Sequence, residues 1–348
     1  MRTLSEVDPN LRIPGFVAGE DVCFYDVRQE PFRVYGVFYE KDRFRRMPEE
    51  VALSVSKNVH YLHSNTTGGR VRFVTDSPYV AVHMETDHVD RMPHFSMTGM
   101  SGLDLYADGR YCGTFVPPTD LEDGFENILD LPSAQLREMT IHMPLYTDVK
   151  TLKIGLKEGS QLLPPSPYAY DKPVVFYGHS ITQGACASRP GNSYPNMLSR
   201  RLQIDHINLG FSGSAKAEPQ MAEYIASLPM LAFVMDYDGN SPTREHLQST
   251  HEPFFKIIRE KNPELPVIFM TATNQARFFR DKELECRKDV IRRTYENALA
   301  AGDQHVYYLD GSKIYEGFDD ATVEGCHAND LGFWLQANAV GALLQQIL

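Results

Sequence analysis

The fold class is indicated by one segment, Val174-Val175-Phe176-Tyr177-Gly178-His179-Ser180-Ile181-Thr182-Gln183-Gly184. It is a short, nearly continuous apolar run that ends in a polar loop flanked by glycines. Such a run is typical of a strand that is buried on both faces of a parallel sheet. Four similar runs follow along the chain, at 206–209, 231–235, 266–270 and 306–309. The sequence therefore predicts a parallel sheet built from these segments.

Helical patterns alternate with the apolar runs and cover residues 193–202, 218–226, 243–260, 282–301 and 330–348. Alternation of strands and helices implies right-handed crossovers, and hence an open, doubly wound α/β sheet. Ligands of such sheets bind outside the carboxyl ends of the strands. We therefore expect a functional site in the loops that follow the strands.

The first 160 residues follow a different rhythm. Apolar residues recur at every second position in the segments 70–74, 79–84, 140–143 and 151–156. This period places them on one face of a strand, and turn signals separate the runs. We predict an antiparallel β-sandwich, or jelly roll, in this half.

A proline-rich segment separates the two halves. Leu162-Leu163-Pro164-Pro165-Ser166-Pro167 holds three prolines in four residues, which neither a helix nor a central strand accommodates. The sequence predicts a β domain over 1–160, a stiff linker over 161–171, and an α/β domain over 172–348.

Charge and apolar patterning exclude several classes of partner. The 348 residues carry a formal net charge of −12, and no cluster of basic residues reverses it locally. Nucleic acid and an anionic membrane surface are therefore poor partners. No apolar run approaches the roughly 20 residues that span a bilayer. We expect a small-molecule or carbohydrate substrate, and the sequence does not determine an oligomeric state.

The cysteines and the N-terminus bear on location. Five cysteines are scattered without a Cys-x-x-Cys pair, which argues against a disulfide framework or a structural zinc site. The first residues lack the apolar core of a signal peptide. Both observations favour a cytoplasmic protein.

Four residues that could offer hydrogen-bonding groups stand at predicted strand ends or before the last helix. They are Ser180 after the first strand, Gly213 after the second, Asn240 after the third, and His327 before the final helix. Each alone has an ordinary explanation, as a turn residue, a helix cap or a surface histidine. Their convergence on one edge of one sheet points to chemistry.

Acyl transfer requires this set of groups. A serine hydroxyl becomes an effective nucleophile when an imidazole accepts its proton, which suits Ser180 and His327. Fixed N–H donors must stabilise the oxyanion, and the backbone amides of Ser180 and Gly213 with the side-chain amide of Asn240 are candidates. Glu324, three residues before the histidine, is the nearest carboxylate that could orient the imidazole.

These residues resemble the four conserved blocks of the SGNH, or GDSL-type, esterase and lipase family. The resemblance spans 172–348 and implies a flavodoxin-like α/β fold and hydrolysis of acyl esters without a metal or other cofactor. It implies that Ser180 is the nucleophile, that Gly213 and Asn240 are oxyanion donors, and that His327 is the base. Ser101-Gly102-Leu103-Asp104-Leu105-Tyr106 resembles the Gly-x-Asp-Leu-Tyr motif of a β domain that precedes SGNH domains in bacteria.

The chain departs from the family pattern at two positions. The family usually has aspartate before the nucleophile, where this chain has His179, and aspartate three residues before the histidine, where this chain has Glu324. A Ser–His dyad with a backbone carbonyl orienting the ring is the alternative to a triad. Arg189 and Asn192, just after the nucleophile, are candidate substrate contacts, with loop packing as the alternative.

The family analogy and the absence of a long apolar lid segment favour a short acyl ester, above all an O-acetyl group on a sugar. Acyl transfer to an alcohol would use the same residues.

Two competing hypotheses concern the first half. A metal site could form from closely spaced ligands, which are His60, His63, His83, Glu85, His88, Asp90 and His94. Alternatively, the β domain could bind carbohydrate through aromatic side chains and dominate a weakly active protein; the candidates are Phe32, Tyr35, Phe38, Tyr39 and Phe44. Aromatic residues in strands more often belong to the core of the sandwich.

Overall fold

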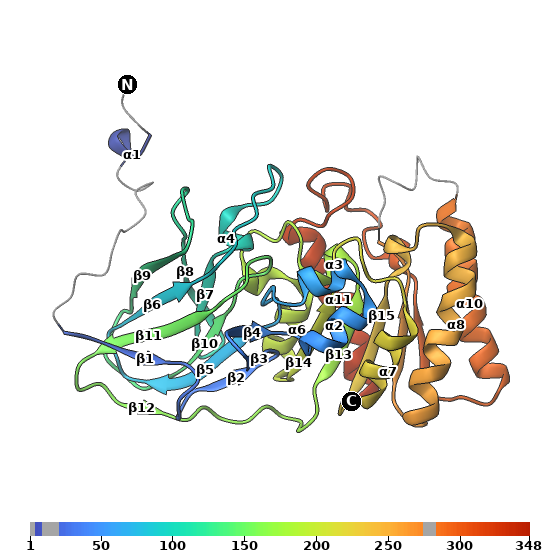
Figure 1. Ribbon diagram of the computed structural model, residues 1–348, viewed down its shortest axis with the longest axis horizontal. Helices are drawn as coiled ribbons and strands as arrows, with labels where there is room; N and C mark the ends of the chain where they lie inside the picture. The colour runs from blue at the N-terminus through green and yellow to red at the C-terminus, as the bar shows by residue number, and fades with distance from the viewer. Residues whose placement is uncertain (1–3, 9–20, 274–282) are drawn as a thin grey trace.

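The computed structural model describes residues 4–8, 21–273 and 283–348. Two parts lie side by side in it, an antiparallel β part formed by the first half of the chain and an α/β part formed by the second (Figure 1).

Two antiparallel sheets form most of the first part. One sheet has the strand order β1-β11-β6-β9, with bounds Val22–Asp26, Thr151–Lys157, Tyr79–Glu85 and Gly124–Asp130. The other has the order β12-β5-β10-β7-β8, with bounds Leu162–Leu163, Arg70–Thr75, Arg137–His142, Leu103–Ala107 and Arg110–Phe115. β2 (Arg33–Tyr35) also pairs with β5, and β3 (Phe38–Glu40) pairs with β4 (Arg43–Arg45).

Alternating side chains of the two sheets share one apolar core. Val71 and Phe73 of β5 are fully buried in it, as are Val80 and Val82 of β6 and Ile154 of β11. Every second side chain of these strands enters this core, in agreement with the predicted period of two. The antiparallel sheets are confirmed, while a jelly-roll connection of the strands stays a prediction.

One parallel sheet forms the centre of the second part, in the order β14-β13-β15-β16-β17. The bounds are His206–Gly210, Val174–Gly178, Ala232–Asp236, Val267–Met270 and Val306–Leu309. Numbered along the chain this is the order 2-1-3-4-5, which is that of flavodoxin-like folds. The predicted parallel α/β sheet is confirmed, and each strand begins and ends within one residue of the predicted bounds.

Helices cover both faces of this sheet. α6 (Tyr194–Leu202) and α11 (Asp330–Ile347) pack on one face, where they meet Phe176 and Val234. The other face is covered by α7, α8 and α10, with bounds Pro219–Ser227, Arg244–Lys261 and Glu283–Ala300. The sheet is therefore doubly wound, which explains why its strands are apolar on both faces.

Two helices in the first half were not expected. α2 (Glu49–Val55) and α3 (Lys57–Leu62) lie within the segment predicted as β domain, yet their buried residues Ala52 and Val59 belong to the core of the α/β part. Figure 1 places both helices against the second part. Packing of a helix from one half against the core of the other cannot be read from local periodicity.

The start of the predicted linker belongs to a sheet. Leu162 and Leu163 form β12, which pairs with Thr75 and Val74 at the edge of β5. Edge strands tolerate a following proline because no neighbour needs its missing N–H. The proposed domain bounds of 160 and 172 stay predictions.

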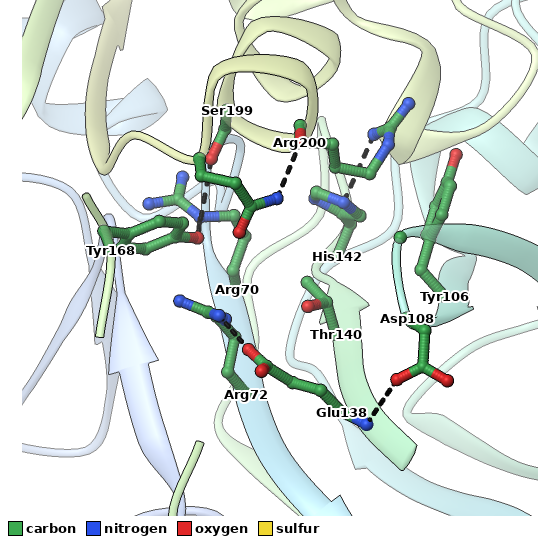
Figure 2. Close-up of a pocket in the computed structure, with 12 residues that line it drawn as sticks. Arg70, Arg72, Tyr106, Asp108, Glu138, Thr140, His142, Tyr168, Ser199 and Arg200 are labelled. Carbon is green, nitrogen blue, oxygen red and sulfur yellow. Dashed lines mark hydrogen bonds and ion pairs between the residues drawn. The ribbon is translucent and has the colours of Figure 1, made fainter. Parts of the chain in front are cut away.

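A polar pocket of about 270 Å³ lies between the two parts. Arg72, Glu138 and Thr140 of the first part face Ser199 and Arg200 of the second across it (Figure 2). Nearby, Arg70 of β5 is buried in an ion pair with Asp205, just before β14. None of the described helices combines the length and apolar character that crossing a bilayer requires.

Candidate active site

The carboxyl ends of three parallel strands bring the predicted site residues together. Gly178, the last residue of β13, is level with Gly210 of β14 and Asp236 of β15. The loops that follow these strands therefore share one edge of the sheet. Asn240 ends the short 3₁₀ helix η3 (Asp238–Asn240) after β15.

Ser180 is the first residue of the short helix α5 (Ser180–Gln183), directly after the central strand. His179 caps this helix, because its Nδ1 accepts a hydrogen bond from the backbone N–H of Ile181 at 3.2 Å. The cap occupies a position where a short polar side chain is common. The Ser180 side chain is consequently held at the sheet edge and stays partly exposed.

A hydrogen-bonded relay joins Ser180 to the loop before α11. His327 Nε2 lies 2.9 Å from Ser180 Oγ, and His327 Nδ1 lies 2.5 Å from Glu324 Oε1. With Nδ1–H donating to the carboxylate, Nε2 presents its lone pair to the serine hydroxyl. The structure brings together the three side chains that the sequence analysis selected, although Ser180 and His327 are 147 positions apart.

Glu324 is fixed by more than the imidazole. Its carboxylate also accepts the backbone N–H of His327 at 3.1 Å, and the backbone N–H of Val323 donates to the carbonyl of His327 at 2.9 Å. Burial alone would raise the pKa of the Glu324 carboxyl, but the hydrogen bonds from His327 outweigh it and lower the pKa. The extra methylene of glutamate is thus accommodated by this tight loop.

The two remaining oxyanion candidates lie in loops that contact each other. Gly213 has φ of 65°, a left-handed conformation that favours glycine, and a Cβ there would meet nothing within 4 Å. The reason for glycine at this position is therefore the backbone conformation and not close packing. Asn240 Nδ2 donates to the carbonyl of Phe211 at 2.8 Å, which ties its loop to that of Gly213. A second N–H of this amide is available to a substrate.

A buried acidic cluster lies behind Ser180. His179 Nε2 is 3.3 Å from Asp236 Oδ1, and a ligand atom of Asp238 lies within 4.8 Å of both residues. Because His179 Nδ1 accepts the Ile181 amide, its proton is on Nε2, which makes this nitrogen a donor rather than a metal ligand. Asp238 immediately precedes Gly239 and Asn240, so this cluster supports the loop that carries Asn240. Asp238 could not be predicted from the sequence as a site residue, since an aspartate after a strand has no distinguishing pattern.

Removal of the Asp238 charge should stabilise the protein at neutral pH. Burial and then the neighbouring Asp236 carboxylate raise the pKa of Asp238 to about 6. A raised carboxyl pKa contributes stability that is full below its unfolded value of 3.8 and is lost as the pH rises through 6. Asp238→Asn mimics the protonated acid, so its free energy of unfolding should exceed the wild type's by up to about 3 kcal/mol at pH 8.

Urea unfolding at pH 8, 6 and 5 measures this effect, and the gain should shrink as the pH falls. Asp120→Asn, at an exposed position, serves as the control and should change stability little at any pH. A gain in the free energy of unfolding that is independent of pH would contradict the raised pKa of Asp238.

Arg189 and Asn192 make protein contacts. Arg189 Nη1 donates to Asp104 Oδ2 at 2.9 Å, and Asn192 Nδ2 donates to Asp330 Oδ2 at 2.8 Å. These contacts favour the loop-packing alternative, and a substrate contact by either residue stays a prediction.

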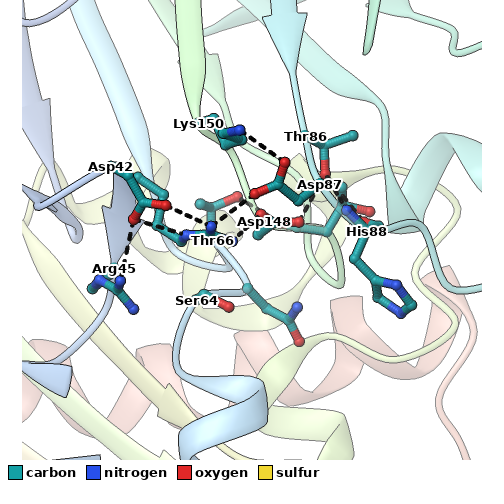
Figure 3. Close-up of polar contacts among 12 residues, drawn as sticks. Asp42, Arg45, Ser64, Thr66, Thr86, Asp87, His88, Asp148 and Lys150 are labelled. Carbon is teal, nitrogen blue, oxygen red and sulfur yellow. Dashed lines mark hydrogen bonds and ion pairs between the residues drawn. The ribbon is translucent and has the colours of Figure 1, made fainter. Parts of the chain in front are cut away.

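The histidines of the first half each contact different residues. His83 Nδ1 lies 2.8 Å from Glu126 Oε1, and His63 Nε2 lies 2.7 Å from Arg45 Nη1. His88 pairs with Asp90 at 3.0 Å. It lies close to Asp87 and Asp148, each of which forms an ion pair with Arg43 (Figure 3). Within residues 21–273 and 283–348, the seven predicted ligands do not meet at one point.

His94 lies at the active site instead. Its ring centroid is 5.7 Å from that of His327, and both histidines form a possible ligand group with Cys186. A second such group joins Glu324 and Cys326 to His327. Since both nitrogens of His327 are already hydrogen-bonded, an ion in either group would displace the relay. The first half of the chain thus contributes a side chain next to His327, which local sequence patterns could not reveal.

The aromatic candidates for carbohydrate binding differ in burial and location. Phe32 and Phe44 are buried in the sandwich core, whereas Phe38 and Tyr39 are exposed on β3. Tyr35 packs edge-on against Tyr168, with ring centroids 4.8 Å apart. The five residues do not line one surface.

Two family profiles match the chain. That of the GDSL-like lipase and acylhydrolase family matches residues 171–345. That of the N-terminal region of SGNH-hydrolase-type esterases, named for Gly-x-Asp-Leu-Tyr, matches residues 22–162. None of the curated proteins matches the chain.

Several solved structures are similar over nearly the whole chain. A protein from Bacteroides ovatus ATCC 8483, described as a GDSL-like lipase, is 26% identical with a TM-score of 0.85, covering 94% of this chain and 98% of its own. The salicylyl-acyltransferase SsfX3 from a tetracycline biosynthetic pathway is 20% identical, with a TM-score of 0.78 and coverage of 95% and 99%. An acetyl xylan esterase from the rumen bacterium Butyrivibrio proteoclasticus is 14% identical, with a TM-score of 0.59 and coverage of 94% and 98%. The last two share the fold.

Proposed function

The chain belongs to the GDSL-like lipase and acylhydrolase family and is a carboxylic-ester hydrolase, and we propose that it removes short acyl groups, above all O-acetyl groups, from carbohydrate through an acyl-enzyme on Ser180. The observation that carries the proposal is the relay of Ser180, His327 and Glu324, with contacts of 2.9 Å and 2.5 Å.

The relay supplies the proton transfers that ester cleavage needs. Ser180 Oγ attacks the carbonyl carbon while its proton passes to His327 Nε2, and the carbonyl oxygen becomes an oxyanion. Collapse of this intermediate breaks the bond to the alcohol, which leaves with the proton from His327. Water then attacks the acyl-enzyme with His327 as base, which releases the acid and restores Ser180. Glu324 stabilises the imidazolium in both steps.

The carbohydrate part of the proposal draws support from relatives of the fold. An acetyl xylan esterase shares the fold over 94% of this chain. The exposed ring of His94 lies 5.7 Å from that of His327, which places it where it could contact a bound substrate. The similar salicylyl-acyltransferase supports transfer to an alcohol as the second candidate, because the same acyl-enzyme serves both outcomes.

An ester panel tests the proposed substrate class. The panel runs from acetylated xylan and acetylated monosaccharides to nitrophenyl esters of two to twelve carbons, with and without an added alcohol. We expect the highest kcat/KM on acetyl esters, with free acetate as the product. Preference for long chains would overturn the acetyl assignment, and capture of the acyl group by the alcohol would favour the transferase.

The oxyanion role of Asn240 is tested by Asn240→Ala. Loss of one preorganised donor should lower kcat by about 10²- to 10³-fold with little change in KM. Asn262→Ala is a matched control, because the Asn262 amide also donates to a main-chain carbonyl, that of Ala226 at 3.0 Å. Asn262 follows helix α8 and precedes the amino end of β16, at the edge of the sheet opposite the candidate site. Losses of similar size in the two variants would assign Asn240 a structural role only.

A further inference from the structure

Strand β7 places two polar side chains of the Gly-x-Asp-Leu-Tyr motif at the boundary between the two parts. Leu103 and Leu105 are fully buried in the sandwich core, and because side chains of a strand alternate, Asp104 and Tyr106 point to the other face. Asp104 is also fully buried. A buried carboxylate requires hydrogen-bonding or charged partners.

The partners of Asp104 lie in the loop that follows the nucleophile. Asp104 Oδ2 accepts from Arg189 Nη1 at 2.9 Å and from the backbone N–H of Gly191 at 2.7 Å. Arg189 Nη1 also donates to the hydroxyl of Tyr106 at 2.5 Å. A Cβ on Gly191 would lie 2.6 Å from both Asp104 Oδ2 and Tyr106 Oη, so only glycine permits this approach.

A second element of the first part holds the same loop. Thr98 Oγ1 in helix α4 (Met97–Met100) and Ser96 Oγ just before it donate to the carbonyl of Ser188 at 2.6 and 3.1 Å. The loop of residues 188–192, which we term the clasp loop, is therefore fixed by the first part at both ends.

The other side of the clasp loop holds the start of α11. The backbone N–H and hydroxyl of Ser188 donate to the carboxylate of Asp330 at 2.9 and 2.5 Å, and Asn192 Nδ2 donates to it at 2.8 Å. Asp330 is the first residue of α11 and lies three residues after His327. A continuous set of contacts thus runs from Asp104 to the segment that carries the catalytic imidazole.

We infer that Asp104, together with Tyr106, is a positioning residue that keeps His327 within hydrogen-bonding distance of Ser180 through the clasp loop and Asp330. This inference rests on the proposed roles of Ser180 and His327. It gives the β part a catalytic purpose, since displacing reacting groups by even 1 Å lowers the rate steeply.

Asp104→Asn and Asp205→Asn form a matched pair of variants. Both remove one carboxylate from an arginine ion pair between the two parts, but Asp205 pairs with Arg70 at the amino end of β14, away from the site. Asp104→Asn should lower kcat by about 10- to 100-fold and leave KM within about twofold. Asp205→Asn should leave kcat unchanged. Equal losses of kcat, or a wild-type kcat in Asp104→Asn, would overturn the inference.

A spectroscopic readout separates this inference from the proposed function. The Nδ1 proton of His327, held by Glu324, gives a downfield NMR signal in histidine-labelled protein that is assigned by its absence in His327→Ala. We expect Asp104→Asn to broaden or lose this signal and Asp205→Asn to keep it. An unchanged signal in Asp104→Asn would overturn the inference, whatever the substrate. Failure of the wild type on every ester would count against the proposed function alone.

A double-mutant cycle tests the route through Asp330. If the effect of Asp104 passes through this carboxylate, the loss of kcat in Asp104→Asn combined with Asp330→Asn should be close to the larger single loss. Multiplication of the two single losses would show that they act independently and would overturn the route.

Discussion

Replacing Ser180 with alanine should lower kcat by about 10⁵- to 10⁶-fold, the scale of loss when a catalytic serine is removed from a Ser–His enzyme. The reason is that the relay from Glu324 through His327 ends on one hydroxyl, at 2.9 Å. Without it no covalent intermediate forms, and the residual rate comes from oxyanion stabilisation of direct water attack. Initial rates on a chromogenic acetate at high enzyme concentration measure the loss.

The fold should be unaffected by this change, because Ser180 Oγ is partly exposed and its backbone retains the contacts of α5. Unchanged thermal unfolding is therefore the control. Ser212, in the neighbouring strand-end loop, is the other serine to test. Substantial turnover by Ser180→Ala together with loss in Ser212→Ala would place the nucleophile in the second loop.

Replacing His327 with alanine should reduce kcat nearly as much, by about 10⁵-fold or more, because the serine then has no base. Glu324→Ala distinguishes a triad from a dyad. The 2.5 Å contact between Glu324 and His327 Nδ1 predicts a triad, for which loss of the carboxylate costs about 10⁴-fold. Rates of the two variants over a range of pH provide the comparison.

Glu324→Gln sharpens this test, since it keeps the side-chain length while removing the charge. A loss close to that of Glu324→Ala shows that the carboxylate matters through its charge and the imidazole tautomer. Losses below tenfold in both variants would instead favour a dyad, with the loop backbone orienting the ring.

The α/β part could be predicted from sequence because its strands are buried on both faces. A run such as Val174–Tyr177 is apolar throughout, and a loop with glycine or polar residues ends it, so its limits are sharp. The ends of the strands also bound the helices between them, so the helix limits could be predicted as well. Ser180 and His327 could be paired because the topology of a parallel sheet places its strand ends at one edge.

Features that depend on contacts between the two halves could not be predicted. Helices α2 and α3 bury Ala52 and Val59 in a core formed by residues far along the chain. Arg189 carries no local sign that its partner is Asp104, 85 positions earlier. His94 reaches His327 in the same way. A single sequence records periodicity within an element, whereas these side chains are explained by surfaces that meet only after folding.

Covalent labelling with a fluorophosphonate, followed by peptide mass mapping, tests most directly whether these distant segments form one active site. We predict a single adduct on Ser180, absent from Ser180→Ala and formed much more slowly in His327→Ala. An adduct on another residue, or labelling of Ser180 at the same rate without the imidazole, would contradict the account.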